Sequence, residues 1–141
     1  MNEIVIDACL ALHFIFPTHS YHSQARRFFN DYARFALIAP PLFVPEADSN
    51  LRYMTKLGKY TIESSEALRA TLYALPITIK HHSSLRERAW DIADLVGAIR
   101  VYDCTYAALA EAHGCEFWTA DKKFYNAAHR HLPFVKFVGS Y

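Results

Sequence analysis

Cysteine is scarce in this chain, and its few cysteines are not spaced as pairs. The 141 residues include three, at positions 9, 104 and 115, with no C-x-x-C spacing. An odd number of cysteines in a small chain argues against a framework of disulfide bonds, which form in oxidising compartments. We therefore expect a protein of a reducing compartment, the cytoplasm.

The chain also lacks a long, unbroken apolar segment. Its first apolar stretch contains Glu3 and Asp7 and is interrupted by His13 and Pro17, so it matches neither a signal peptide nor a membrane span. Repeats, low-complexity segments and linkers are absent as well, while hydrophobic residues make up 52% of the sequence. That content is sufficient for one full core. We expect residues 1–141 to form a single soluble domain without a membrane segment.

Short apolar runs alternate with segments of helical periodicity. Strands are expected at residues 3–6, 36–39, 77–80, 115–119 and 135–138. Helices are expected at residues 8–16, 20–35, 43–57, 84–96, 103–113 and 121–131, and from residue 61 to the turn before Pro76. This order predicts an α/β protein in which helices cover both faces of a mainly parallel, about five-stranded sheet, a three-layer α/β/α arrangement.

Four acidic residues fall where expected strands end or expected helices begin. Asp7 and Asp121 each follow a strand, Asp103 lies on the first turn of a helix, and Glu46 begins another. In open sheets with crossover helices, the functional crevice lies outside the carboxyl ends of the strands. We therefore expect the four side chains to face one crevice. The alternative for an aspartate at a helix start, considered alone, is an N-cap.

Four carboxylates in one crevice require a positive partner. Two of them ~4 Å apart repel by roughly 4 kcal/mol at an effective dielectric constant of about 20. Oxygen ligands without histidine select hard divalent cations, so the set predicts Mg²⁺ or Mn²⁺. Such an ion activates water for attack on phosphorus, and metal-assisted phosphodiester cleavage is the natural reaction. Outside this set, ten acidic residues face fifteen basic ones, and this +5 balance suits a polyanionic substrate.

Three stretches of the sequence resemble one family. They read IVIDACLALHF, APPLFVPEADSNL and VYDCTYAALAEAHGCEFWTADKKF. Together they resemble a PIN-domain ribonuclease. In chain length and in the residues of these motifs, the sequence is most similar to VapC-type toxins of toxin–antitoxin modules. The resemblance covers essentially the whole chain, and its third stretch is the most specific.

The resemblance implies a PIN-like fold and a Mg²⁺- or Mn²⁺-dependent endoribonuclease that cleaves single-stranded or loop RNA. Asp7, Glu46, Asp103 and Asp121 match its acidic quartet, and Thr119 matches a hydroxyl residue that would hydrogen-bond a carboxylate or the metal's water shell. The resemblance further implies a homodimer and a partner antitoxin. Alternatives are a housekeeping RNA-processing nuclease and a non-catalytic PIN scaffold that binds RNA or protein.

The sequence departs from the family pattern at two cysteines. Cys9 stands where serine is common, and Cys104 where alanine is usual, so an oxidation switch near the site is conceivable. Small buried cysteines are, however, ordinary packing residues. A haloacid-type phosphatase is disfavoured, because it needs a second aspartate at the position of Cys9.

The sequence gives weaker support for a functional role of other polar and aromatic residues. Lys122 and Lys123 follow Asp121 and are candidates for contacts with RNA phosphates. We expect Asp48 to be solvent-exposed, and the paired histidines 81–82 and 129–131 lack the spacing of a helical zinc site. Candidates for contact with a dimer partner or an antitoxin are Tyr53, Tyr60 and Tyr73.

Overall fold

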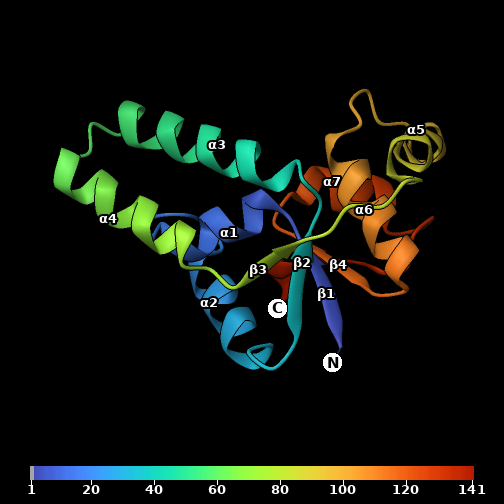
Figure 1. Ribbon diagram of the computed structural model, residues 1–141, viewed down its shortest axis with the longest axis horizontal. Helices are drawn as coiled ribbons and strands as arrows, with labels where there is room; N and C mark the ends of the chain where they lie inside the picture. Colours follow the sequence, from blue (N-terminus) through green and yellow to red (C-terminus); the bar gives the residue numbers. More distant parts are fainter. Residues whose placement is uncertain (1) are drawn as a thin grey trace.

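A computed structural model describes residues 2–141 and has a five-stranded parallel sheet at its centre (Figure 1). The strands are β1 (Glu3–Ile6), β2 (Ala36–Ala39), β3 (Ile77–Ile79), β4 (Glu116–Thr119) and β5 (Val135–Phe137). Their spatial order is β3-β2-β1-β4-β5, and every neighbouring pair runs parallel. The expected α/β class with a mainly parallel sheet of about five strands is confirmed.

Helices cover the sheet on two sides. They are α1 (Ala8–Ile15), α2 (His22–Asp31), α3 (Phe43–Leu57), α4 (Ile62–Tyr73), α5 (Leu85–Val96), α6 (Tyr102–His113) and α7 (Lys122–Ala128), with a short 3-10 turn at Val138–Ser140. Helices α1 to α4 lie on one side of the strands and α5 to α7 on the other, and the α3–α4 hairpin extends away from the sheet (Figure 1). Right-handed crossovers explain this division. From β1 through β2 to β3 the chain moves toward one edge of the sheet, and from β3 through β4 to β5 it moves toward the other edge, so the connecting helices lie on opposite faces.

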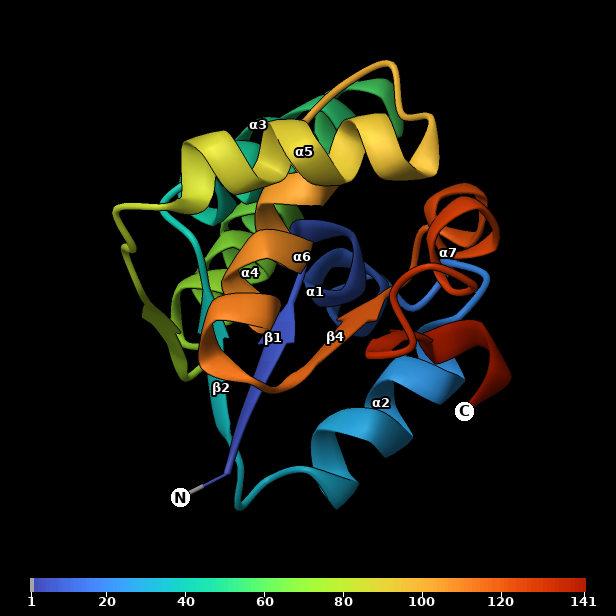
Figure 2. The same ribbon diagram turned by 90° about the vertical axis from the view of Figure 1, so that its right-hand side faces the viewer.

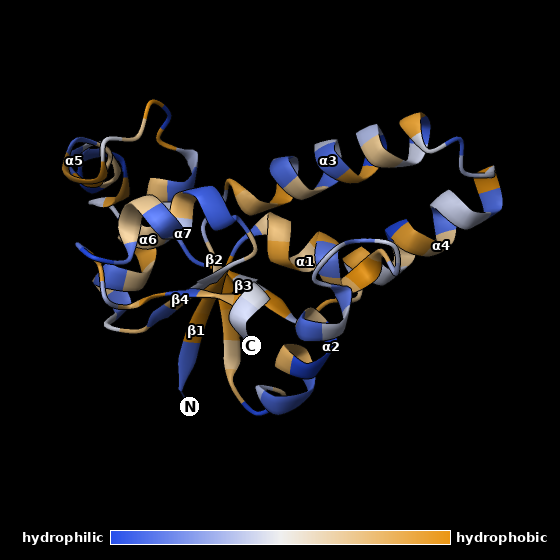
Figure 3. Cartoon of the chain, turned by 180° about the vertical axis from the view of Figure 1, so that it is seen from behind, coloured by the Kyte–Doolittle hydropathy of each residue, from blue (hydrophilic) through white to orange (hydrophobic). Residues whose placement is uncertain are grey.

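The core consists of the two faces of the sheet and the helices packed on them. Successive residues of β1 point to opposite faces. Val5 therefore belongs to the cluster that contains α6, whereas Ile4 and Ile6 pack with Phe28 of α2. Figure 3 shows hydrophobic residues along the strands and α1, and hydrophilic residues on the outer turns of α2 and α4. No helix among residues 2–141 has the length and apolar character needed to cross a bilayer.

Helix α6 is held firmly in place. It is buried over much of its length and packs against α5, where Arg88 and Glu111 form a two-point ion pair. Gly97 and Gly114 end α5 and α6 with φ angles of 72° and 63°, in the left-handed region that favours glycine. The first turn of α6, and Asp103 with it, is thereby fixed relative to the sheet.

Two helices end three or four residues before the position that the sequence pattern predicts. The helix expected at residues 20–35 spans His22–Asp31, and the one expected at residues 121–131 spans Lys122–Ala128. Tyr32 and Phe35 still pack on the α2 core although they follow the helix, because turns carry their side chains back to the sheet. The apolar periodicity of the sequence therefore extends beyond the last residue of each helix.

Candidate active site

The carboxyl ends of β1 and β4 lie side by side, and the candidate site is built on them (Figure 2). Asp7 follows β1 and is the N-cap of α1, where its Oδ1 accepts a hydrogen bond of 2.8 Å from the Leu10 backbone N–H. Asp121 follows β4 and is the N-cap of α7, where its Oδ1 accepts a bond of 3.0 Å from the Phe124 N–H. Capping thus holds both side chains in defined orientations.

Thr119 connects these two aspartates. It is the last residue of β4, and its hydroxyl donates a hydrogen bond to Oδ2 of Asp7. The same hydroxyl oxygen accepts a bond of 2.9 Å from the Asp121 backbone N–H. Thr119 is 0% exposed and Asp7 is 1% exposed, so these bonds lie in the interior. The contact between Thr119 and a carboxylate, implied by the resemblance, is present.

Asp103 lies on the first turn of α6 but does not cap it. The N-cap is Val101, and no side chain bonds to the free backbone N–H groups there. The Asp103 side chain instead lies within reach of the charges of the other three acids, which raise its pKa. The capping alternative therefore applies to Asp7 and Asp121 and is wrong for Asp103.

Glu46 reaches the site from the first turn of α3, on the opposite side from α6. The hydroxyl of Tyr106 donates a hydrogen bond of 3.0 Å to its Oε1. Tyr106 is fully buried in α6 and stacks on Phe117, with ring centroids 5.7 Å apart. Tyr106 was not among the site residues expected from the sequence. The available signal was the residue type, since a buried tyrosine usually has a partner for its hydroxyl.

The charges of neighbouring acids raise the pKa values of Asp7 and Asp103, so the four acids lie close enough to interact electrostatically. Burial raises the pKa of Asp7 to about 7, against the hydrogen bonds from Thr119 and Leu10, and the charges of Glu46 and Asp121 add to the increase. Burial also raises the pKa of Asp103 to about 8, with contributions from the other three acids. The pKa of Glu46 is raised by burial and lowered by its bond from Tyr106.

Within residues 2–141, the four acids have no basic side chain paired with them. Among residues 2–141, no lysine or arginine forms a salt bridge with any of them. In the same part of the chain, no three His, Cys, Asp or Glu side chains are disposed to hold a metal ion together as they stand. Mg²⁺ usually keeps several waters and needs only one or two direct carboxylates. A donor set of carboxylate oxygens with unneutralised charge fits such a cation.

The cysteines near the site are poor nucleophiles. Burial raises the pKa of the Cys9 thiol far above its ordinary value, and the charge of Asp7 raises it further. Burial and the charge of Asp103 raise the pKa of Cys104 to about 11. Cys9, Cys104 and Cys115 are all free. These environments suppress the thiolate and give no support to an oxidation switch.

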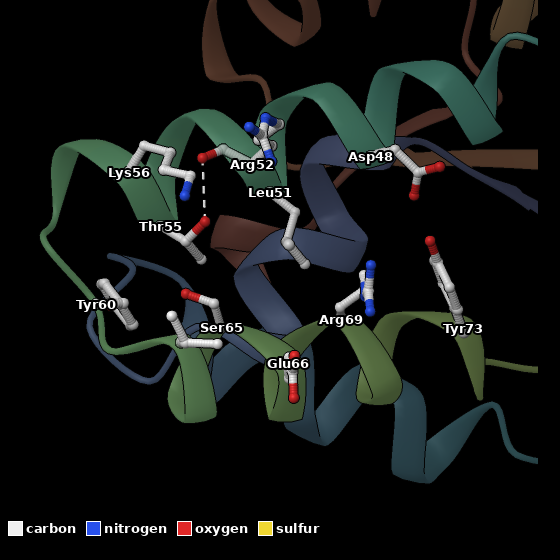
Figure 4. A pocket seen from close by; sticks show the side chains of 11 residues that line it. Asp48, Leu51, Arg52, Thr55, Lys56, Tyr60, Ser65, Glu66, Arg69 and Tyr73 are labelled. Atoms are coloured by element: carbon white, nitrogen blue, oxygen red, sulfur yellow. Dashed lines mark hydrogen bonds between the residues drawn. The ribbon is translucent and has the colours of Figure 1, made fainter.

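A separate hollow of about 320 Å³ lies between α3 and α4, and none of the four acids lines it (Figure 4). Asp48, which is exposed as expected, faces it from α3 together with Arg52 and Lys56. Tyr60 and Tyr73 lie at its opposite side. These two basic residues of α3 thus lie apart from the candidate carboxylates.

The remaining candidates from the sequence are distributed over the surface. His81, His82 and His131 are exposed, and His129 bonds to the carbonyl of Tyr125. Lys122 and Lys123 are both exposed beside Asp121.

Comparison with known proteins identifies relatives of this fold. The sequence model of the PIN domain family matches residues 4–130. No curated protein sequence matches the chain. The structure is similar to that of PAE2754 from Pyrobaculum aerophilum, with a TM-score of 0.66 and 19% identity over 99% of this chain and 92% of the other. It is also similar to VapC20 from Mycobacterium tuberculosis, a toxin that cleaves the sarcin-ricin loop, with a TM-score of 0.59 and 17% identity over 88% and 94%.

Proposed function

This chain belongs to the PIN domain family, and on that premise we propose that it is a metal-dependent endoribonuclease. The observation that supports the proposal is that Asp7, Glu46, Asp103 and Asp121 stand at strand ends or helix starts, and that the charges of the others raise the pKa values of Asp7 and Asp103. A carboxylate-only site whose acids form no salt bridge with any lysine or arginine of residues 2–141 suits a divalent cation and a phosphodiester substrate.

The residues of the chain would act as follows. Asp7, Asp103, Asp121 and Glu46 would hold Mg²⁺ or Mn²⁺, directly or through water. When bound, the ion supplies Lewis-acid activation of a water molecule and of the phosphoryl oxygens. Thr119 orients Asp7 by its hydrogen bond, and the Tyr106 hydroxyl orients Glu46. Because water attacks phosphorus and a P–O bond breaks, the 2′-hydroxyl of the RNA takes no part in bond formation.

We further propose that the protein is the toxin of a toxin–antitoxin pair, with an antitoxin as partner and a homodimer as its assembly. The support is the fold similarity to a toxin that cleaves RNA, VapC20. Residues 1–141 would form one domain, and the three free cysteines support the cytoplasm as its location. A housekeeping nuclease or a non-catalytic scaffold would share this fold and differ in cellular effect or activity.

The activity is tested with purified protein and a mixture of single-stranded and hairpin RNAs. We expect cleavage with Mg²⁺ or Mn²⁺, none with EDTA, and a loss of at least about a hundredfold in Asp7→Asn and Asp103→Asn. A single 2′-deoxy substitution at the mapped cut site should leave cleavage intact. Cleavage without metal, or unaltered cleavage by both variants, contradicts the proposal, and tight RNA binding without cleavage under every metal favours the scaffold.

The toxin role is tested in cells. Expression of the wild-type chain should stop growth, expression of Asp103→Asn should not, and co-expression of the neighbouring gene should restore growth. Equal growth with the wild-type and Asp103→Asn chains argues for housekeeping RNA processing.

A further inference from the structure

A cavity of about 520 Å³ opens directly beside the candidate carboxylates. Asp103 and Asp121 form part of its lining, and the loop of residues 97–100 and the first residues of α7 form the rest. Its volume lies within the range of pockets that hold small ligands. The cavity therefore extends the acidic site toward the surface between α6 and α7.

Two basic residues line this cavity next to the acids. Arg100 belongs to the loop that joins α5 to α6, and Lys123 belongs to α7. Both are exposed, and among residues 2–141 neither forms a salt bridge with a carboxylate. They therefore do not serve to neutralise Asp103 or Asp121. Two unpaired basic side chains beside a cluster of acids suit a ligand that carries several negative charges, one near the acids and another near the basic side chains.

The same cavity has an apolar side chain with no cover. Ile99 is 99% exposed, although it is a large hydrophobic residue. The loop that carries it leaves α5 at Gly97, whose φ of 72° sets the direction of the turn. Covering apolar surface with another apolar group is favourable in water. Ile99 is thus placed to contact a flat, largely apolar group such as a nucleobase.

We propose that this cavity is a nucleotide-binding subsite: Arg100 and Lys123 bind a phosphate adjacent to the scissile one, and Ile99 contacts the attached base. The substrate class rests on the proposed nuclease function, since a polynucleotide carries one negative charge per nucleotide. The subsite holds the RNA chain in register, so that one phosphate lies at the acids while its neighbour lies at the two cations. Arg100 and Lys123 are binding residues and take no part in the chemical step.

The neighbouring lysines provide a matched test of the phosphate contact. Lys122 and Lys123 are both exposed, but only Lys123 lines the cavity. Binding of a fluorescein-labelled single-stranded RNA of about ten nucleotides is measured by anisotropy in EDTA at several salt concentrations. For Lys123→Ala and Arg100→Ala we expect about a five- to tenfold higher Kd and a salt slope reduced by about 0.7. Lys122→Ala should have a clearly smaller effect, and Lys123→Arg should restore binding.

Cleavage kinetics separate binding from chemistry. Lys123→Ala and Arg100→Ala should raise KM by about the same factor as Kd and leave kcat within about twofold. Equal losses in Lys122→Ala and Lys123→Ala overturn the subsite, because they indicate general attraction between the RNA and a basic surface. A large fall in kcat with an unaltered KM also overturns it.

The base contact is tested by coupling. A series of RNAs carries one abasic nucleotide at each position around the cut site. In the wild-type protein one position next to the cut should weaken binding, and in Ile99→Ser the same abasic position should have no further effect. Additive losses overturn the contact. If Ile99→Ser instead alters only the elution volume in size-exclusion chromatography, this side chain belongs to a protein interface and the base contact is wrong.

The outcomes distinguish the subsite from the nuclease function. If wild-type protein binds RNA but does not cleave it under any metal, the nuclease proposal fails, and the Lys122 and Lys123 comparison still decides the subsite. If it cleaves RNA while both lysine variants behave alike, the subsite fails and the nuclease proposal stands. If it neither binds nor cleaves RNA, both fail.

Discussion

The Thr119 hydroxyl donates a hydrogen bond to the Asp7 carboxylate across 112 positions of sequence, and it accepts one from the Asp121 backbone. This bond joins the ends of β1 and β4, and both partners are buried. One side chain thereby sets the relative position of two candidate metal ligands. Fold stability and the geometry of the acidic site thus depend on the same hydroxyl group.

Replacing Thr119 by valine should therefore lower both stability and activity. Valine keeps the shape but leaves Oδ2 of Asp7 and the Asp121 N–H without their partner, which costs roughly 1–3 kcal/mol. Thr119→Ser keeps the hydroxyl and serves as the control. Urea unfolding measures the free energy of unfolding, and RNA cleavage measures activity. Matching values for the valine and serine variants in both assays would refute this role.

In metal-free buffer, Asp103→Asn should be more stable than the wild type at high pH. The folded-state pKa of Asp103 is raised from 3.8 to about 8, so between these values the folded protein binds more protons than the unfolded chain. The wild type therefore loses stability as pH rises through this window. At pH 4 the acid is protonated in the folded protein and about half protonated in the unfolded chain, so the two proteins should be similar. At pH 8.5 we expect the variant to be more stable by roughly 1–3 kcal/mol.

The measurement is urea unfolding in EDTA at the two pH values. Addition of Mg²⁺ should stabilise the wild type at pH 8.5 and Asp103→Asn much less, because binding to the folded state shifts unfolding by mass action. An asparagine variant that is less stable than the wild type at both pH values, or equal Mg²⁺ stabilisation of both, contradicts the electrostatic account.

Removal of the Tyr106 hydroxyl should reduce catalysis more than stability. Tyr106→Phe keeps the stack on Phe117 but frees Oε1 of Glu46. Side chains that orient a metal ligand typically contribute about tenfold or more in metal affinity or activity. We expect about a tenfold lower kcat with RNA affinity retained.

A double-mutant cycle provides the control for this prediction. Tyr106→Phe should have little further effect in a Glu46→Gln background, because the two residues act through one hydrogen bond. Multiplicative losses in kcat would show that Tyr106 acts independently of Glu46.

His13 should make the fold sensitive to acid. Its Nδ1 accepts a hydrogen bond of 3.2 Å from the Tyr21 N–H, so this nitrogen is unprotonated. Burial lowers its pKa from 6.5 to about 4, with further contributions from His19 and His22. The folded state thus binds fewer protons than the unfolded chain between these values. The stabilising contribution of the neutral ring is complete above pH 6.5 and is lost as pH falls to about 4.

Thermal unfolding at pH 4.5 and 7.5 measures this effect. His13→Gln can retain an acceptor for the Tyr21 N–H without titrating, so its Tm should fall less between pH 7.5 and pH 4.5 than that of the wild type. Parallel decreases in the two proteins would exclude His13 as the acid-sensitive group.

Local sequence signals account for much of this fold. The strand at residues 36–39 and the helix at 43–57 occur as predicted, because apolar runs, turn residues and helix-ending glycine coincide there. The positions of Asp7 and Asp121 at strand ends were likewise local properties. Helix ends were less predictable, as α2 and α7 show, because the apolar side chains that follow them pack on the same core.

The sequence by itself determined which elements form, that the strands run parallel, and that acidic residues stand at their carboxyl ends. Only the tertiary structure decided which partner each acid has. It makes caps of Asp7 and Asp121, leaves Asp103 free among the acids, and gives Glu46 the hydroxyl of Tyr106. The physical reason is range: periodicity and capping act within a few residues, whereas these hydrogen bonds and charge interactions join positions that only the packed sheet and helices bring together.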